Sequence, residues 1–208
     1  MKVVLLNGSP NEKGCTFTAL SEVAKVLNAE GVETEIVQSG RAPVRDCIAC
    51  CKCFELGGKC VFDDDMVNGI IQKIIAADGL VVGSPVYYAH PSGRILSILN
   101  RVFFAGMGRF KGKVAAAVVS ARRGGTTASL DAINKHFTIS EMPVVSSSYW
   151  NMVHGMTPAD VAQDSEGLQT MRNLGRNMAW LIKCIDAGKN GGIALPETER
   201  GNSTNFIR

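Results

Sequence analysis

The chain of 208 residues lacks the features that mark several large classes of protein. No apolar run approaches the roughly 18 residues that a membrane-spanning helix needs. The apolar residues that follow Met1 are too few for the core of a signal peptide. The net charge is only +3 and no long block of like charges occurs, so nucleic acid is not an expected partner. We therefore expect a cytoplasmic protein without a membrane partner.

Three well-known enzyme motifs are also absent. The dinucleotide-binding pattern G-x-G-x-x-G does not occur. The Gly-rich loop near the N-terminus has five residues between its glycines, and Cys15 stands where a triphosphate-binding loop requires lysine. None of the three histidines, His90, His136 and His154, accompanies a nucleophile motif of hydrolases. These absences argue against an NAD-type Rossmann site, nucleotide triphosphate hydrolysis and hydrolase chemistry.

What the sequence does contain is the composition of one packed domain. Hydrophobic residues make up 46% and charged residues 20% of the chain, which excludes the composition of disordered proteins. Short apolar runs alternate with longer amphipathic stretches. The runs predict strands at residues 2–7, 32–37, 79–83, 114–120 and 143–147, and the amphipathic stretches predict helices at residues 17–29, 63–77, 91–104, 126–137 and 167–187.

This alternation predicts an α/β domain with a doubly wound, five-stranded parallel sheet in the flavodoxin-like order 2-1-3-4-5. The domain would span residues 1–187, with an irregular Cys-rich insertion at about residues 40–62 and a C-terminal tail at residues 188–208. In such sheets ligands bind at the carboxyl ends of the strands, where the strand order reverses. The loops at residues 8–16 and 83–93 are expected to meet there.

The first of these loops has the composition of an anion site. A loop between a strand and a helix presents free backbone N–H groups at the positive end of the helix dipole. Ser9 and Thr16 can donate from their hydroxyls and Asn11 from its amide, while the two glycines allow a tight turn. The loop therefore fits a monophosphate better than a triphosphate, although an ordinary Gly-rich connection can have a similar composition.

The second loop is rich in proline and aromatic residues, and a flat heterocycle can lie against it. In these loops and two further motifs the sequence resembles the NADPH-dependent FMN reductase and iron-sulfur flavoprotein group of the flavodoxin superfamily. The resemblance covers about residues 1–187. The motifs that carry it are Gly8-Ser9-Pro10, Pro85-Val86-Tyr87, Asn100-Arg101 and Arg123-Gly124-Gly125.

The resemblance implies FMN as the cofactor and NAD(P)H as the electron donor. The residues that it implies for the FMN phosphate are Ser9, Asn11, Cys15 and Thr16. Those that it implies for the isoalloxazine ring and ribityl chain are Pro85, Val86, Tyr87, Tyr88, Arg122, Arg123, Gly124 and Gly125. Relatives often carry Asn or Ser where this chain has Gly14-Cys15, so one phosphate contact departs from the family pattern. The arginines and tyrosines also suit ordinary surface positions.

Five of the seven cysteines fall within fourteen positions of the insertion. Cys47, Cys50 and Cys53 are each three residues apart and Cys60 follows, a compact four-thiolate spacing that favours an iron-sulfur cluster or, less strongly, zinc. The spacing resembles the motif of iron-sulfur flavoproteins, which implies a 4Fe-4S cluster on these four residues. Free thiols are an alternative, because cluster-free relatives carry similar segments and Cys51 exceeds what a four-ligand site needs.

Two functions follow from the resemblance. The first is an FMN-dependent oxidoreductase that passes electrons from NAD(P)H to a quinone, a flavin or another small acceptor, without an obligatory acid-base residue because the cofactor carries the chemistry. The second is an iron-sulfur flavoprotein that relays electrons between protein partners through FMN and a 4Fe-4S cluster. The resemblance also implies a homodimer or homotetramer. An anion sensor, by contrast, would leave residues 85–88 without a purpose.

Overall fold

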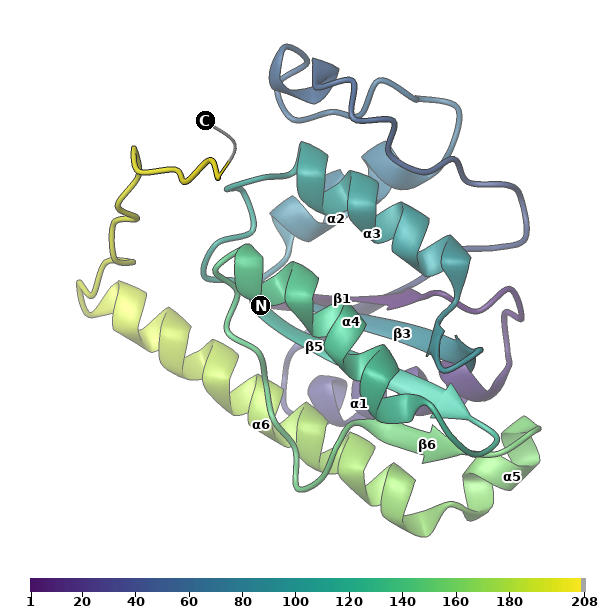
Figure 1. The fold of residues 1–208 in the computed structure, drawn as a ribbon. Helices are drawn as coiled ribbons and strands as arrows, with labels where there is room; N and C mark the ends of the chain where they lie inside the picture. The colour runs from purple at the N-terminus through teal and green to yellow at the C-terminus, as the bar shows by residue number, and fades with distance from the viewer. Residues whose placement is uncertain (207–208) are drawn as a thin grey trace.

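A parallel sheet between two layers of helices forms the body of the molecule (Figure 1). The structure is a computed structural model and describes residues 1–206. The parallel strands, in the order β2-β1-β3-β5-β6, have the predicted arrangement 2-1-3-4-5. Their bounds are β1 Lys2–Asn7, β2 Glu33–Gln38, β3 Gly79–Tyr87, β5 Val114–Ala121 and β6 Met152–His154. The short strand β4 (His90–Pro91) pairs antiparallel with the end of β3.

The helices cover both faces of this sheet. Their bounds are α1 Cys15–Ala29, α2 Val67–Ala76, α3 Gly93–Ala105, α4 Thr126–Ile139, α5 Pro158–Gln163 and α6 Ser165–Asn190. Side chains alternate along each strand, so Val4 and Leu6 of β1 pack under α2, α3 and α4, while Val3 and Leu5 pack against α1 and α6. All four are fully buried, and each such side chain contributes roughly 1.5–3 kcal/mol to folding.

The predicted last strand at residues 143–147 is wrong. Only an isolated bridge between Val144 and Ala115 joins this segment to the sheet, and the edge strand is β6, several residues later. The serines that follow Val144 bond to α6 instead of to the sheet. The backbone carbonyl of Ser146, for example, accepts from Asn177 Nδ2 of α6 at 2.8 Å. An apolar run can lie beside a sheet without forming a strand when a helix satisfies its polar groups.

Several predicted boundaries also shift. Helix α2 begins at Val67 rather than at residue 63, and the preceding aspartates accept hydrogen bonds from its first turn. Val67 N donates to Asp65 Oδ1 at 3.0 Å, and Asn68 Nδ2 donates to Asp63 Oδ1 at 2.9 Å. Strand β3 extends to Tyr87, so the predicted loop at residues 83–93 is in part a β-hairpin with β4. Helix α6 spans Ser165–Asn190, which is longer at both ends than the predicted helix at residues 167–187.

The Cys-rich insertion lies beyond α2 and α3, on the opposite side of these helices from the sheet (Figure 1). Its regular structure is one short 3-10 turn, Lys52–Phe54. The tail folds back on the body, since Lys111 Nζ donates to Pro196 O at 2.6 Å. Residues 207–208 of the predicted tail lie outside the described residues. Among residues 1–206, no helix is both long and apolar enough to cross a membrane.

Candidate functional site

Three loops leave the carboxyl ends of β1, β3 and β5 and meet at one edge of the sheet. Gly8 N donates to Gly83 O at 2.8 Å, and Ser92 Oγ donates to Gly8 O at 3.1 Å, so the first two loops are hydrogen-bonded together. Gly125 in the third loop has a φ of +90°, and a Cβ there would lie 2.9 Å from the Cβ of Ala89. The third loop therefore approaches the second so closely that only glycine fits.

The loop after β1 presents donors at the start of α1. Asn11 N donates to Ser9 Oγ at 3.1 Å, which leaves the hydroxyl hydrogen of the buried Ser9 free to donate elsewhere. Gly14 caps α1, and within the described residues no side chain caps this helix and no acidic residue lies in its first turn. The first backbone N–H groups of a helix need an acceptor. This loop therefore presents a nest of donors at the start of a helix whose first turn has no acidic residue, and such a nest suits an anion.

Residues that the sequence analysis missed hold this nest in place. Asn7 Nδ2 donates to Gln38 Oε1 at 2.6 Å, and Gln38 Nε2 donates to Ser9 O at 2.7 Å. Arg41 donates to Asn11 Oδ1 at 3.1 Å, which brings a cation beside the loop. These partners lie about thirty residues apart in sequence, and no local motif announces them.

Two of the predicted phosphate residues have their side chains engaged elsewhere. The hydroxyl of Thr16 is buried and shares a 2.8 Å hydrogen bond with Ser120 Oγ of β5. The thiol of Cys15 lies 3.7 Å from Gly155 O, and burial raises the pKa of this thiol. Both residues lie in the first turn of α1, so their backbone N–H groups belong to the nest, although their side chains bond to β5 and to the residue that follows β6.

The predicted ring residues lie on two adjacent loops. Pro85 and Val86 are half-buried, whereas Tyr87 is exposed and Tyr88 is fully exposed at the tip of the β3–β4 hairpin. The loop from Arg122 to Gly124 is exposed beside it. Gly125 also serves as the N-cap of α4, and in the described chain it offers that helix no side-chain cap. The two loops thus form an open face with helix N–H groups at one edge.

The cysteines of the insertion gather around one small cavity of about 20 Å³. Cys53 is buried, Cys60 is half-buried, and the other three are exposed. Among the described residues, no group of three or more His, Cys, Asp or Glu side chains is arranged to hold a metal ion. The donor chemistry nevertheless fits an iron-sulfur cluster, because soft thiolates meet here in apolar surroundings. The cavity is lined by Cys47, Ile48, Cys50, Cys51, Cys53, Cys60, Val61, Phe62, Arg101, Phe104 and Ala105.

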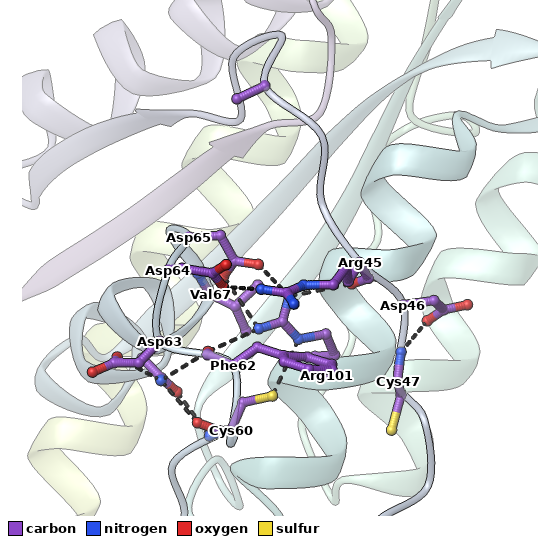
Figure 2. Close-up of polar contacts among 12 residues, drawn as sticks. Arg45, Asp46, Cys47, Cys60, Phe62, Asp63, Asp64, Asp65, Val67 and Arg101 are labelled. Atoms are coloured by element: carbon purple, nitrogen blue, oxygen red, sulfur yellow. Dashed lines mark hydrogen bonds and ion pairs between the residues drawn. The ribbon is translucent and has the colours of Figure 1, made fainter.

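A buried arginine forms part of this cavity (Figure 2). Arg101 of α3 is 1% exposed, and its Nε donates to Cys60 Sγ at 3.2 Å. Its terminal nitrogens donate to both carboxylate oxygens of Asp65, to Phe62 O at 3.1 Å and to Arg45 O at 3.2 Å. All five guanidinium hydrogens therefore have nearby acceptors, which fixes the orientation of the group.

The charges of this pair are stabilised mutually. Burial favours a neutral Arg101, but its hydrogen bonds to Asp65 and Cys60 raise the pKa of the guanidinium above its ordinary value. Burial likewise favours a neutral Asp65, yet the bonds from Arg101 and from the backbone N–H of Val67 lower the pKa of the carboxyl. Both groups are thus ionised, in line with the rule that buried charges are paired.

Comparison with known proteins decides the family. The sequence profile of the NADPH-dependent FMN reductases matches residues 1–157. The chain belongs to this family. An iron-sulfur flavoprotein of Methanocaldococcus jannaschii is 35% identical over 193 residues, covering 89% of this chain and 99% of that relative. An iron-sulfur flavoprotein of Methanosarcina thermophila is 28% identical over 194 residues, covering 91% of this chain and 100% of that relative.

Solved structures agree with this FMN reductase family member in fold. A flavodoxin from the domain Archaea superimposes with a TM-score of 0.60 at 14% identity, covering 88% of this chain and 99% of the other. An NAD(P)H:quinone oxidoreductase from Methanothermobacter marburgensis gives a TM-score of 0.63 at 17% identity, covering 86% of this chain and 96% of the other. The predicted fold, family and class, a flavin oxidoreductase, are confirmed. The electron acceptor and the metal centre stay predictions.

Proposed function

We propose that this family member is an FMN-dependent oxidoreductase whose Cys-rich insertion holds a 4Fe-4S cluster, through which electrons pass between FMN and an external redox partner. The observation that carries the proposal is the gathering of five cysteines around one cavity beside α3. The two relatives named iron-sulfur flavoproteins align with this chain along nearly their whole length, which supports the proposed cluster.

In this proposal the loop after β1 binds the phosphate of FMN. The Ser9 hydroxyl and the N–H groups of the first turn of α1 donate to the phosphate oxygens, and Arg41 adds positive charge beside Asn11. Cys15 and Thr16 take part through their backbone N–H groups, because their side chains bond elsewhere.

The ring of FMN would lie against the hairpin and the loop after β5. Pro85, Val86, Tyr87 and Tyr88 provide the flat and apolar surface, and the stretch 122–125 provides N–H groups and cations for the pyrimidine edge. A positive potential at that edge stabilises the reduced anionic ring. We assign no side chain as an acid or base. The role of this domain, residues 1–187, is to orient the cofactor.

The proposed ligands of the cluster are Cys47, Cys50, Cys53 and Cys60. Cys53 and Cys60 lie on the inner side of the insertion, and Cys47 and Cys50 come from its exposed part. Such a cluster supplies one-electron transfer when bound. Cys51, which has a left-handed backbone with a φ of +57°, is the cysteine left over.

A second function, reduction of a quinone, a flavin or another small acceptor by NAD(P)H, is favoured by the family match and by the open ring face. The exposed Tyr87 and Tyr88 leave that face accessible to small molecules. We further propose a homodimer or homotetramer, which rests on the resemblance to the family. Sedimentation of the purified holoprotein tests this assembly, and a monomer at all concentrations would contradict it.

Two measurements on anaerobically purified protein separate these functions. Native mass spectrometry identifies the bound flavin, and chemical analysis gives the iron and sulfide content per chain. The relay requires bound FMN together with about four iron and four sulfide per chain. Cys53→Ser should abolish iron binding, whereas Cys51→Ser, the matched control, should retain it. FMN without iron in the wild-type protein would favour the reductase with a small acceptor. A protein that takes up no flavin would contradict both functions.

A further inference from the structure

Arg101 makes Cys60 different from the other cysteines of the insertion. Among the side-chain hydrogen bonds of the described residues, its bond to Cys60 is the one in which a cysteine sulfur accepts from a charged group. The guanidinium is 1% exposed and is held by Asp65 and by two backbone carbonyls (Figure 2). Bulk water therefore screens this charge poorly.

We infer that Arg101 sets the reduction potential of the proposed cluster by directing a charged hydrogen bond at the ligand sulfur of Cys60. This inference rests on the proposed function. Reduction adds one electron and no proton to the cluster, so the cluster and its thiolates gain one unit of negative charge. A fixed positive charge and an N–H donor at a ligand sulfur stabilise that reduced state more than the oxidised state. Arg101 acts through Cys60 and is a positioning residue rather than a catalytic one.

Asp65 has the opposite influence on the same cluster. Its carboxylate is 11% exposed and accepts from both terminal nitrogens of Arg101, which partly neutralises the guanidinium. Removing the negative charge of Asp65 should therefore strengthen the field of Arg101 at Cys60. We therefore expect substitutions of Arg101 and of Asp65 to shift the reduction potential of the cluster in opposite directions. Partial unfolding of the insertion in both variants would not produce opposite signs.

Arg45 provides a matched control on the same aromatic ring. Its guanidinium carbon lies 4.1 Å from the ring centroid of Phe62, and that of Arg101 lies 5.2 Å from it. The Arg45 side chain, however, is 51% exposed and pairs with Asp64. Arg45→Gln therefore removes one positive charge from the same region without touching a cysteine sulfur.

The test is an anaerobic redox titration of the holoprotein in which the electron paramagnetic resonance signal of the reduced cluster is the readout. The iron content of each variant is measured as well. We expect Arg101→Gln to lower the ratio of reduced to oxidised cluster at a fixed potential by about tenfold or more, which is about 59 mV for one electron. We expect Asp65→Asn to raise this ratio and Arg45→Gln to leave it close to that of the wild type.

Each outcome decides the inference. Equal potentials for Arg101→Gln and Arg45→Gln, or shifts of the same sign for Arg101→Gln and Asp65→Asn, would overturn it while leaving the relay intact. If Arg101→Gln lost its iron, Asp65→Asn would decide the inference, and a reduction potential of Asp65→Asn equal to or below that of the wild type would overturn it. Wild-type protein without iron would overturn the relay and the inference together.

Discussion

The contact between the two ring loops can be tested by replacing Gly125 with alanine. Gly125 has a φ of +90°, a conformation that costs an L-residue about 1–2 kcal/mol. The new Cβ would lie 2.9 Å from the Cβ of Ala89 and 3.0 Å from Cγ1 of Val86, so the hairpin tip must also move. FMN binding must restore the original loop geometry against this strain and these contacts. We expect that to cost at least about 1.4 kcal/mol of binding free energy, which is a tenfold rise in the Kd for FMN.

Titration of the apoprotein with FMN, followed by quenching of flavin fluorescence, measures this change. Gly69→Ala in α2 is the matched control, because a Cβ at Gly69 meets nothing within 4 Å, its backbone is not left-handed and it lies outside the proposed FMN site. We expect Gly69→Ala to bind FMN like the wild type. Equal affinities of the Gly125→Ala and Gly69→Ala proteins would refute the proposed placement of the ring between the two loops.

Three further predictions concern the phosphate nest and the buried ion pair. Ser9→Ala should weaken FMN binding by roughly tenfold to a hundredfold, from the loss of about 1.5–3 kcal/mol for a hydrogen bond to a charged group, but should leave riboflavin binding unchanged; calorimetry that shows equal losses for both flavins would contradict the phosphate assignment. Arg41→Gln should raise the Kd for FMN several-fold at low salt and less at high salt, because this exposed charge is screened, and a salt-independent effect would argue against an electrostatic role. The lowered pKa of Asp65 means that its ion pair stabilises the fold fully above its ordinary pKa of 3.8 and that this stabilisation is lost as the pH falls through the folded pKa. The stability advantage of the wild type over Asp65→Asn in urea should therefore shrink as the pH falls below about 4, and an advantage of the same size at about pH 5 and about pH 2 would show that the carboxylate charge is not its source.

Local patterns carried much of the prediction of fold and family. The apolar runs of β1, β3 and β5 are buried on both faces, so they are continuous in sequence and mark central parallel strands. The proposed phosphate loop and the Pro-Val-Tyr turn are short contiguous motifs, and the sequence places them after the first and third strands, although β3 itself extends through Tyr87. Cysteine spacing likewise indicated a thiolate site, and five cysteines do line one cavity.

The features that only the tertiary structure decided are contacts between segments that lie far apart in the sequence. Residues 143–147 make one bridge to the sheet, and beyond it the Ser146 carbonyl bonds to α6, which an apolar pattern does not reveal. Arg101 and Cys60 are 41 residues apart, and their bond exists because the insertion folds over α3. The sequence by itself determined which segments can be strands, helices and ligand loops, because periodicity and short motifs are local properties. The tertiary structure determined which side chains meet, because a buried charge or donor takes the partner that packing brings to it.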